Sequence, residues 1–320
     1  MSRQILRRAR ATSAADARRL GKRGAGVAHG LLRDLGALLD LGTLRGIRRG
    51  FRANDGPGLA AQLAFYLTLA LFPLVLVLVS LVGTFSGPQF AAEVLAYFRQ
   101  ILPPPVYGVM ELYAADALQG LSPAPGALAA GAAVTLWVAA RFFRALISAL
   151  NRIYGLRETR PAWKVRLFAF LMTLGLSGVV LAGVLLLVAG PSIGVFVAEI
   201  FGLGRPFELL WLVARWPTAL LFLSVTVALV YYLAPNFGQP FRLIVPGGLV
   251  AVLLWALASV AFGFWAGNFG LYDQLYGPIA TVILLLIYLY VSCISLLLGA
   301  QANAAILEER GRGQPAGETG

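Results

Sequence analysis

Residues 127–166 read ALAAGAAVTLWVAARFFRALISALNRIYGLRETRPAWKVR, and this stretch decides the fold. It begins as an apolar run, continues in helical period past Arg141 and Arg144 to Asn151, and ends in a loop rich in Arg and Lys. A membrane-spanning helix needs about 20 mostly apolar residues, and cytoplasmic loops collect basic residues. The stretch therefore predicts a transmembrane helix whose cytoplasmic end is marked by its charge.

The composition of the whole chain is also typical of a membrane protein. Of its 320 residues, 59% are hydrophobic and 12% are charged, and the mean hydropathy is +0.79. A soluble globular domain is about 25% charged. The single cysteine, Cys293, excludes an internal disulfide, and with the single histidine, His29, it excludes a His/Cys metal cluster. We therefore predict no metal and no cofactor.

The net charge of +12 points to lipids rather than to nucleic acid. The basic residues lie beside the apolar spans, and no aromatic RNA-binding pattern accompanies them. We expect membrane lipids as partners, with anionic headgroups at the cytoplasmic face.

The sequence predicts an all-α, polytopic membrane protein with six transmembrane helices. Besides the opening span, the apolar spans are 59–85, 163–190, 209–233, 246–266 and 278–306. With the N-terminus inside, every Lys and Arg except Arg99, Arg205 and Arg215 lies in an inner segment or at an inner span end. Because cytoplasmic loops carry this excess, we predict that both termini are cytoplasmic.

The remaining segments flank a membrane domain at 55–307. Residues 1–26 and 308–320 are predicted to be disordered tails. Residues 27–52 alternate apolar and basic positions at near-helical spacing, which indicates an amphipathic helix on an anionic leaflet. The alternative is a cytosolic basic helix that packs on another loop.

Two outer segments are less defined. Residues 86–124, which the prolines at 103–105 divide, are predicted to form interfacial helices on the outer face. Residues 191–203 are apolar but carry Glu199, so a continued helix, a re-entrant piece and an outer cap all stay open.

Four polar residues share one face of the opening helix at intervals of three, four and three. They are Arg141, Arg144, Ser148 and Asn151. If the helix reaches Tyr154, Arg141 lies roughly 20 Å before its end. One interpretation is a basic cavity that binds an anionic ligand through these four residues. The other is that the helix leaves the hydrocarbon near Arg141 and both guanidinium groups snorkel to the headgroups.

Span 278–306 carries a second polar line, which serves either helix packing or a transport pathway. It is formed by Thr281, Tyr288, Ser292, Ser295 and Asn303. In span 246–266, Ser259, Gly263 and Gly267 recur every four residues, which either favours close helix packing or follows from the abundance of glycine.

The outer loop between the last two spans is polar and aromatic. Its candidate residues are Tyr272, Asp273, Tyr276 and Gly277. Tyrosines at this depth form an interfacial belt, and a gate or binding lip is the alternative. No Asp or Glu lies inside any predicted span, which argues against a carboxylate-driven pump.

Several motifs resemble the YihY/BrkB family of bacterial inner-membrane proteins. They are LAAQLAFYLTLALFPLVLVL at 59–78, RALISALNRIYGLRETRPAWKVRL at 144–167, YYLAPNF at 231–237 and the run that begins VPGGLV at 245. The resemblance covers about 55–307. The family's motif residues carry over to Leu150, Asn151, Arg152, Tyr154, Pro235, Pro246, Gly247, Tyr276 and Gly277. The family's Gly-Ala-Glu motif is Gly299-Ala300-Gln301 here, so a charge is missing.

The resemblance implies six transmembrane helices and a location in the bacterial plasma (inner) membrane. Family members were once labelled ribonuclease BN, but no convergent nucleophile, base or metal set supports an enzyme here. Others have been connected with serum resistance and with movement of lipid or lipopolysaccharide precursors. We therefore predict a non-enzymatic protein that transports or translocates an anionic lipid or other amphiphile. The alternative is a non-transporting scaffold for envelope assembly. A lateral opening between spans two and six would favour transport, and a closed bundle the scaffold.

Overall fold

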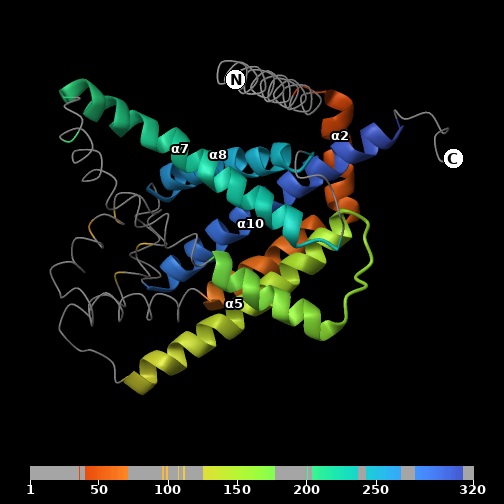
Figure 1. Ribbon diagram of the computed structural model, residues 1–320, viewed down its shortest axis with the longest axis horizontal. Helices are drawn as coiled ribbons and strands as arrows, with labels where there is room; N and C mark the ends of the chain where they lie inside the picture. The colour runs from red at the N-terminus through yellow and green to blue at the C-terminus, as the bar shows by residue number, and fades with distance from the viewer. Residues whose placement is uncertain are drawn as a thin grey trace, which may run out of the picture.

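The computed structural model describes residues 40–70, 125–176, 204–236, 243–267 and 278–312, with the single residues Gly36, Ala96, Arg99, Tyr107, Glu111 and Ile200. Every regular element within these residues is helical (Figure 1). The helices are α2 (Leu41–Ala53), α5 (Pro125–Ile153), α7 (Gly204–Leu233), α8 (Val245–Gly267) and α10 (Pro278–Arg312), with two more at 56–70 and 162–176. The all-α prediction is confirmed for this part of the chain.

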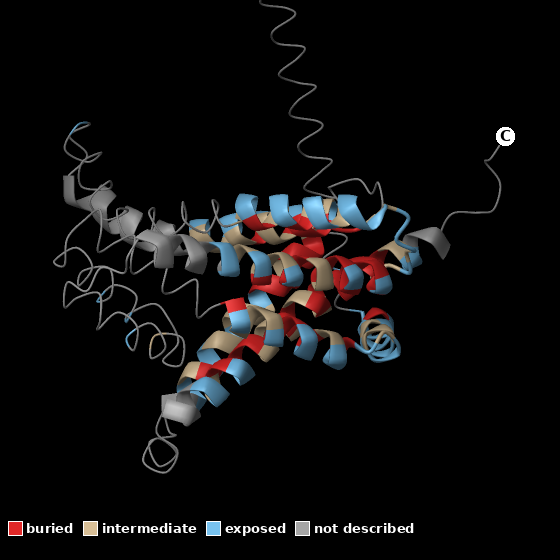
Figure 2. Ribbon diagram, turned by 90° about the horizontal axis from the view of Figure 1, so that it is seen from below, coloured by how far each residue is buried: buried red, intermediate tan, exposed pale blue. Residues whose placement is uncertain are grey.

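Helix α10 lies at the centre of the packing. It contacts α8, α2 and α5, and α7 packs against α8. Buried residues gather where the helices meet, while exposed residues lie on the outer sides of the helices (Figure 2). The largest fully buried side chains include Leu63, Leu146, Tyr231 and Leu297. One core therefore joins the helix at 56–70 to α5, α7 and α10.

The helix ends that the sequence assigns to the cytoplasm gather at one end of the bundle, which we call the inner end. There α5, α7 and α10 finish, and α8 and the helices at 56–70 and 162–176 begin (Figure 1). The Asn54 Nδ2 donates to the Gln301 Oε1 at 3.3 Å, which joins the turn before the helix at 56–70 to α10. This arrangement fits the predicted alternation of the spans. The side of the membrane that this end faces stays a prediction.

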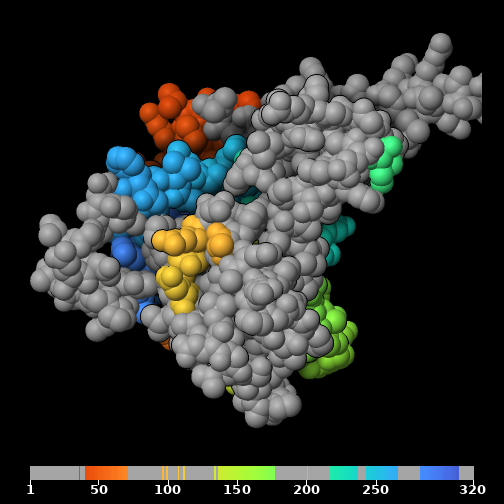
Figure 3. Space-filling view, turned by 90° about the vertical axis from the view of Figure 1, so that its left-hand side faces the viewer, coloured from red at the N-terminus to blue at the C-terminus, as the bar shows by residue number. Residues whose placement is uncertain are grey.

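Two helices among the described residues are long and apolar enough to cross a membrane, at Val245–Trp265 and Val282–Glu309, and a shorter apolar helix covers Pro217–Leu233. Leu253, Leu257 and Val260 form an exposed apolar stripe on α8, and Figure 3 shows α8 at the molecular surface. Such a surface is suited to lipid. These features support a membrane location, while the count of six spans stays a prediction.

A very close helix contact among the described residues joins α8 to α10. A Cβ atom added at Gly299 would lie only 2.4 Å from the Gly247 carbonyl oxygen, so neither position tolerates a side chain without a shift. The fully buried Asn303 accepts from the Gly247 N–H at 2.7 Å and donates to the Ile244 carbonyl at 2.9 Å. It thereby satisfies a backbone donor in the first turn of α8. Gly263, one of the predicted packing glycines, has no neighbour around its Cβ position.

Helix α2 begins after Asp40, whose carboxylate accepts from the backbone N–H of Gly42 and Thr43. This is an N-cap, and α2 covers the later part of the predicted range of 27–52, while residues 27–39, apart from Gly36, lie outside the described residues. The helix lies across the inner end of the bundle (Figures 1 and 2). One of its sides packs against α10, where Ile47 contacts the cluster of Ala302 and Ile306. The helix thus packs on α10 and exposes a basic side, and its contact with an anionic leaflet stays a prediction.

Several predictions lie outside the described residues. They concern the tail at 1–26, the residues beyond 312, most of the outer segment 86–124, residues 191–199 and the outer loop with Tyr272, Asp273, Tyr276 and Gly277.

Candidate functional site

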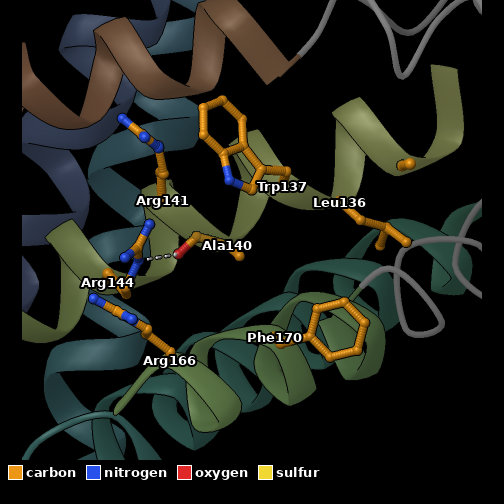
Figure 4. Close-up of a pocket in the computed structure, with 8 residues that line it drawn as sticks. Leu136, Trp137, Ala140, Arg141, Arg144, Arg166 and Phe170 are labelled. Atoms are coloured by element: carbon orange, nitrogen blue, oxygen red, sulfur yellow. Dashed lines mark hydrogen bonds between the residues drawn. The ribbon is translucent and has the colours of Figure 1, made fainter. Parts of the chain in front are cut away.

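A pocket of about 530 Å³ opens between α5 and the helix at 162–176. Its lining residues are Ala133, Leu136, Trp137, Ala140, Arg141, Arg144, Arg166 and Phe170 (Figure 4). Three of these are arginines and the others are apolar or aromatic. The pocket therefore contains both predicted arginines of the opening helix and adds a third from the next helix.

The two arginines of α5 are held in different ways. The Arg141 guanidinium lies over the Trp137 ring, 4.0 Å from its centroid. This is a cation–π contact between two residues that are one helical turn apart on α5. Arg144 is half-buried, and its Nε donates to the Ala140 carbonyl at 3.4 Å. Each guanidinium carries five N–H donors, so both keep donors for a ligand.

The pocket has a basic end and an apolar end. Arg141, Arg144 and Arg166 lie together at one end, and Leu136 and Phe170 lie at the other (Figure 4). Because α5 finishes and the helix at 162–176 begins at the inner end, the basic end is the one nearer to it. An amphiphile whose headgroup faces the inner end would match this order.

No carboxylate among the described residues neutralises this charge. The lining contains no Asp or Glu, and the ion pair found within the described ranges joins Arg160 to Glu158 in the loop. Three guanidinium groups beside low-dielectric walls raise the local positive potential and concentrate anions. Arginine also binds phosphate and carboxylate through paired hydrogen bonds. The pocket is thus chemically suited to an anionic group.

The turn after α5 directs the chain into the helix that supplies Arg166. Gly155 adopts a φ of +66°, the Leu156 N–H donates to the Asn151 carbonyl at 2.7 Å, and the Gly155 N–H donates to the Arg152 carbonyl. This is a Schellman C-cap, in which a left-handed glycine ends the helix. The glycine of the sequence motif therefore has a backbone role.

A polar cluster then fixes the loop to the end of α7. We call it the inner-loop cluster, and it consists of the side chains of Asn151, Glu158, Arg160 and Asn236. Arg160 donates twice to the Glu158 carboxylate, at 2.8 Å each, and once to the Ala234 carbonyl at 3.0 Å. These bonds to Arg160 hold the pKa of Glu158 below its ordinary value and outweigh burial, which raises the pKa.

Asn151 belongs to this cluster rather than to the pocket. Its Nδ2 donates to Glu158 at 2.9 Å, and its Oδ1 accepts from the Asn236 N–H at 2.9 Å. Ser148 is exposed and does not line the pocket either. The structure brings Arg141 and Arg144 together with Arg166 and separates them from the other two candidates. Ligand binding by Ser148 and Asn151 stays a prediction.

Two residues of the polar line of the last span, Tyr288 and Asn303, contact α8. Tyr288 and Ser259 share a hydrogen bond of 3.0 Å, and Ser292 and Ser295 each donate to the carbonyl four residues earlier on α10. Asn303 binds the start of α8 as described above. Tyr288 and Asn303 thus take part in packing, and a pathway role of the polar line stays a prediction. The side chain of Thr281 lies outside the described set.

Sequence reasoning did not select Arg166, Trp137 or Phe170 as site residues. Arg166 was counted only as part of the basic loop. The glycine at 155 was a usable signal in the sequence. If the chain reverses there, the first turns of the next helix, which carry Arg166, lie beside the last turns of α5. That inference needs the loop geometry, which spacing alone does not supply.

Apolar spanning helices with a basic pocket near one end define the class, an all-α membrane protein. The chain belongs to the family described as Virulence factor BrkB, whose sequence model matches residues 47–319.

The chain is 29% identical to the ribonuclease-like protein YfkH of Bacillus subtilis, over 80% of this chain and 92% of that protein. It is also 29% identical to a UPF0761 membrane protein of Pseudoalteromonas translucida, over 78% and 81% of the two chains. A UPF0761 membrane protein of Xanthomonas campestris is 30% identical over 77% of this chain and 56% of its own length. No solved structure matches this chain.

Proposed function

We propose that this protein binds the anionic headgroup of a lipid or other amphiphile in the pocket between α5 and the helix at 162–176, and moves that molecule through the inner membrane. The observation that carries the proposal is the gathering of Arg141, Arg144 and Arg166 without a carboxylate among the lining residues. The aromatic side chains of Trp137 and Phe170 supply the surface for the apolar part of the ligand.

The volume of the pocket agrees with this proposal. Small-molecule sites measure about 300–1,000 Å³, and 530 Å³ falls within that range. A whole lipid with two long chains is larger than this, so the chains would extend into the bilayer. A lateral opening between spans two and six would favour transport, whereas this pocket lies between the second and third predicted spans. A lateral route for lipid would therefore run beside the helix at 162–176.

We also propose that the role is non-enzymatic. The lining residues include no His, Cys, Ser, Asp or Glu that would act as a nucleophile or base. Among the described residues, no group of three or more His, Cys, Asp or Glu gathers where a metal ion would bind.

The test is a lipid-movement assay with purified protein in vesicles that contain a labelled anionic lipid. We expect Arg141→Gln and Arg144→Gln to lower the rate of movement while membrane insertion stays normal, with Arg→Lys giving partial rescue because Lys keeps the charge but loses paired bonding. Arg152→Gln is the matched control, since Arg152 is an exposed arginine of α5 outside the pocket. Unchanged movement in the double Gln variant would reject the proposal.

A scaffold for envelope assembly is the second candidate. The close contact of Gly247 with Gly299 favours it, because such packing suits a rigid bundle. Normal insertion without any lipid movement by the unmodified protein would support this candidate.

The orientation belongs to the same proposal: six spans in the inner membrane with both termini cytoplasmic. Reporters fused after Lys22, Arg157, Gln239 or Arg312 should be cytoplasmic, and reporters after Ser122, Leu203 or Gln274 should face outward. An outward reporter at Arg157 would overturn this topology.

A further inference from the structure

Helix α2 presents a basic surface at the inner end that the pocket does not use. Arg45, Arg48, Arg49 and Arg52 are all exposed, and Leu41–Ala53 contains no Asp or Glu. None of these four forms an ion pair with a carboxylate among the described residues. Four like charges on about two turns of helix repel one another, so this surface favours an anionic partner.

The packing of α2 fixes the direction in which this surface points. Thr43 is buried, Ile47 contacts the cluster of α10, and the Gln301 side chain lies against Gly50 and bonds Asn54. Residues 43, 47 and 50 follow the helical period, so they form one packed side. The four arginines occupy the opposite side. The basic surface is therefore held by α10 at a constant position on the bundle.

An exposed apolar edge separates the packed side from the basic side. Successive residues of an α-helix are rotated by about 100°, so Leu44 lies between Ile47 and Arg48 when the helix is viewed along its axis. Phe51 lies on the same side as Leu44, two turns further along. Leu44 is 47% exposed and Leu41 is 68% exposed. Exposed leucines next to arginines, on a helix that lies across the end of a bundle, form the pattern of a helix at a membrane surface (Figure 1).

We propose that α2 docks on the anionic headgroups of the inner leaflet, with the edge at Leu44 among the lipids and the four arginines at the level of the phosphates. Charge-assisted hydrogen bonds from guanidinium to phosphate supply the attraction, and the leucine edge supplies apolar burial. This inference rests on the proposed orientation of the inner end. It does not depend on ligand binding in the pocket.

The experiment compares two labelled positions on opposite edges of α2. A nitroxide is attached at Leu44→Cys or at Gly46→Cys, in full-length protein that carries Cys293→Ala and is reconstituted in nanodiscs with anionic lipid. Gly46 is the matched control, because it is exposed, nothing lies within 4 Å of its Cβ position, and it points about 200° away from Leu44. Accessibility to oxygen, which partitions into lipid, is measured against accessibility to a polar nickel reagent.

We expect the label at position 44 to show a severalfold higher ratio of oxygen to nickel accessibility than the label at position 46. Equal ratios, with both labels accessible to water, would overturn the proposal. A higher ratio at position 46 would equally overturn it, because the lipid would then contact the wrong edge.

The charge dependence is tested in the same system. Replacing the anionic lipid by a zwitterionic one, or introducing Arg48→Gln with Arg52→Gln, should lower the ratio at position 44 towards that of position 46. An unchanged ratio in both experiments would overturn the role of the arginines. If the proposed orientation is wrong, a reporter fused after Lys22 will face outward. If the proposed function of the pocket is wrong, lipid movement will be normal in the Arg141 and Arg144 variants.

Discussion

Two regions of the same bundle differ in packing and in charge. One is the contact between α8 and α10, and the other is the pocket between α5 and the helix at 162–176. At the first, backbones approach until Gly247 and Gly299 leave no room for a Cβ, and Asn303 uses its amide for two backbone bonds. At the second, three arginines face an open space without a carboxylate in the lining. An interface that is tightly packed and fully hydrogen-bonded stabilises the fold. Charged side chains that lack a partner beside a cavity are instead typical of a site where a ligand supplies the opposite charge.

The largest effect is expected at the tight contact. In Gly299→Ala, the new methyl group would lie 2.4 Å from the Gly247 oxygen and 2.6 Å from the Ala251 Cβ, so the helices must separate. Overpacking a core typically lowers the free energy of unfolding by about 1–3 kcal/mol. Because the new methyl group meets backbone, we expect the loss in this variant to reach or exceed the upper end of that range. Thermal unfolding of the protein in detergent measures the loss.

Gly263→Ala is the matched control for that variant, because nothing lies within 4 Å of the position that the new Cβ on α8 would take. It should leave the unfolding temperature unchanged or raise it slightly, since alanine favours a helix over glycine. Equal losses in the two variants would contradict the tight contact.

A smaller effect is expected in the inner-loop cluster. Glu158→Gln removes the ion pair with Arg160 and should lower the free energy of unfolding by about 1 kcal/mol. The loss is small because the pair is partly exposed and solvent screens its charges. The pKa of Glu158 is lowered in the folded protein, so its contribution is fully present above the ordinary pKa of a glutamate and is lost as the pH falls through the folded pKa. Unfolding of the unmodified protein and of Glu158→Gln should therefore converge at low pH. A difference that persists in acid would show that the charge is not responsible.

The smallest effect is expected at Tyr154. Its hydroxyl is buried and has no hydrogen-bond partner among the described residues, although the Asn303 amide that binds the start of α8 lies beside it. Tyr154→Phe removes an unsatisfied polar group, so the unfolding temperature should stay the same or rise slightly. A clear fall would mean that the hydroxyl bonds Asn303 after all.

These contrasts also mark what the sequence was able to predict. The helical class and the shared side of Arg141 and Arg144 follow from local periodicity, which is visible in one segment. The contribution of Arg166 depends on how the turn at Gly155 folds one helix beside another. Asn151 was placed with the arginines by its spacing, but Glu158 and the distant Asn236 engage its amide instead. The close approach at Gly299 likewise depends on Gly247, more than fifty residues earlier.

The central claim is that the three arginines of the pocket bind an anionic headgroup, and an equilibrium binding measurement tests it most directly. Binding of a fluorescent lipid phosphate is compared between the unmodified protein, the Arg141→Gln/Arg144→Gln/Arg166→Gln variant and the Arg152→Gln control, with a zwitterionic lipid as competitor. A charged hydrogen bond contributes about 1.5–3 kcal/mol, so the triple variant should bind at least about tenfold more weakly while the control is unchanged. Equal affinities in the triple variant and the control would contradict the account.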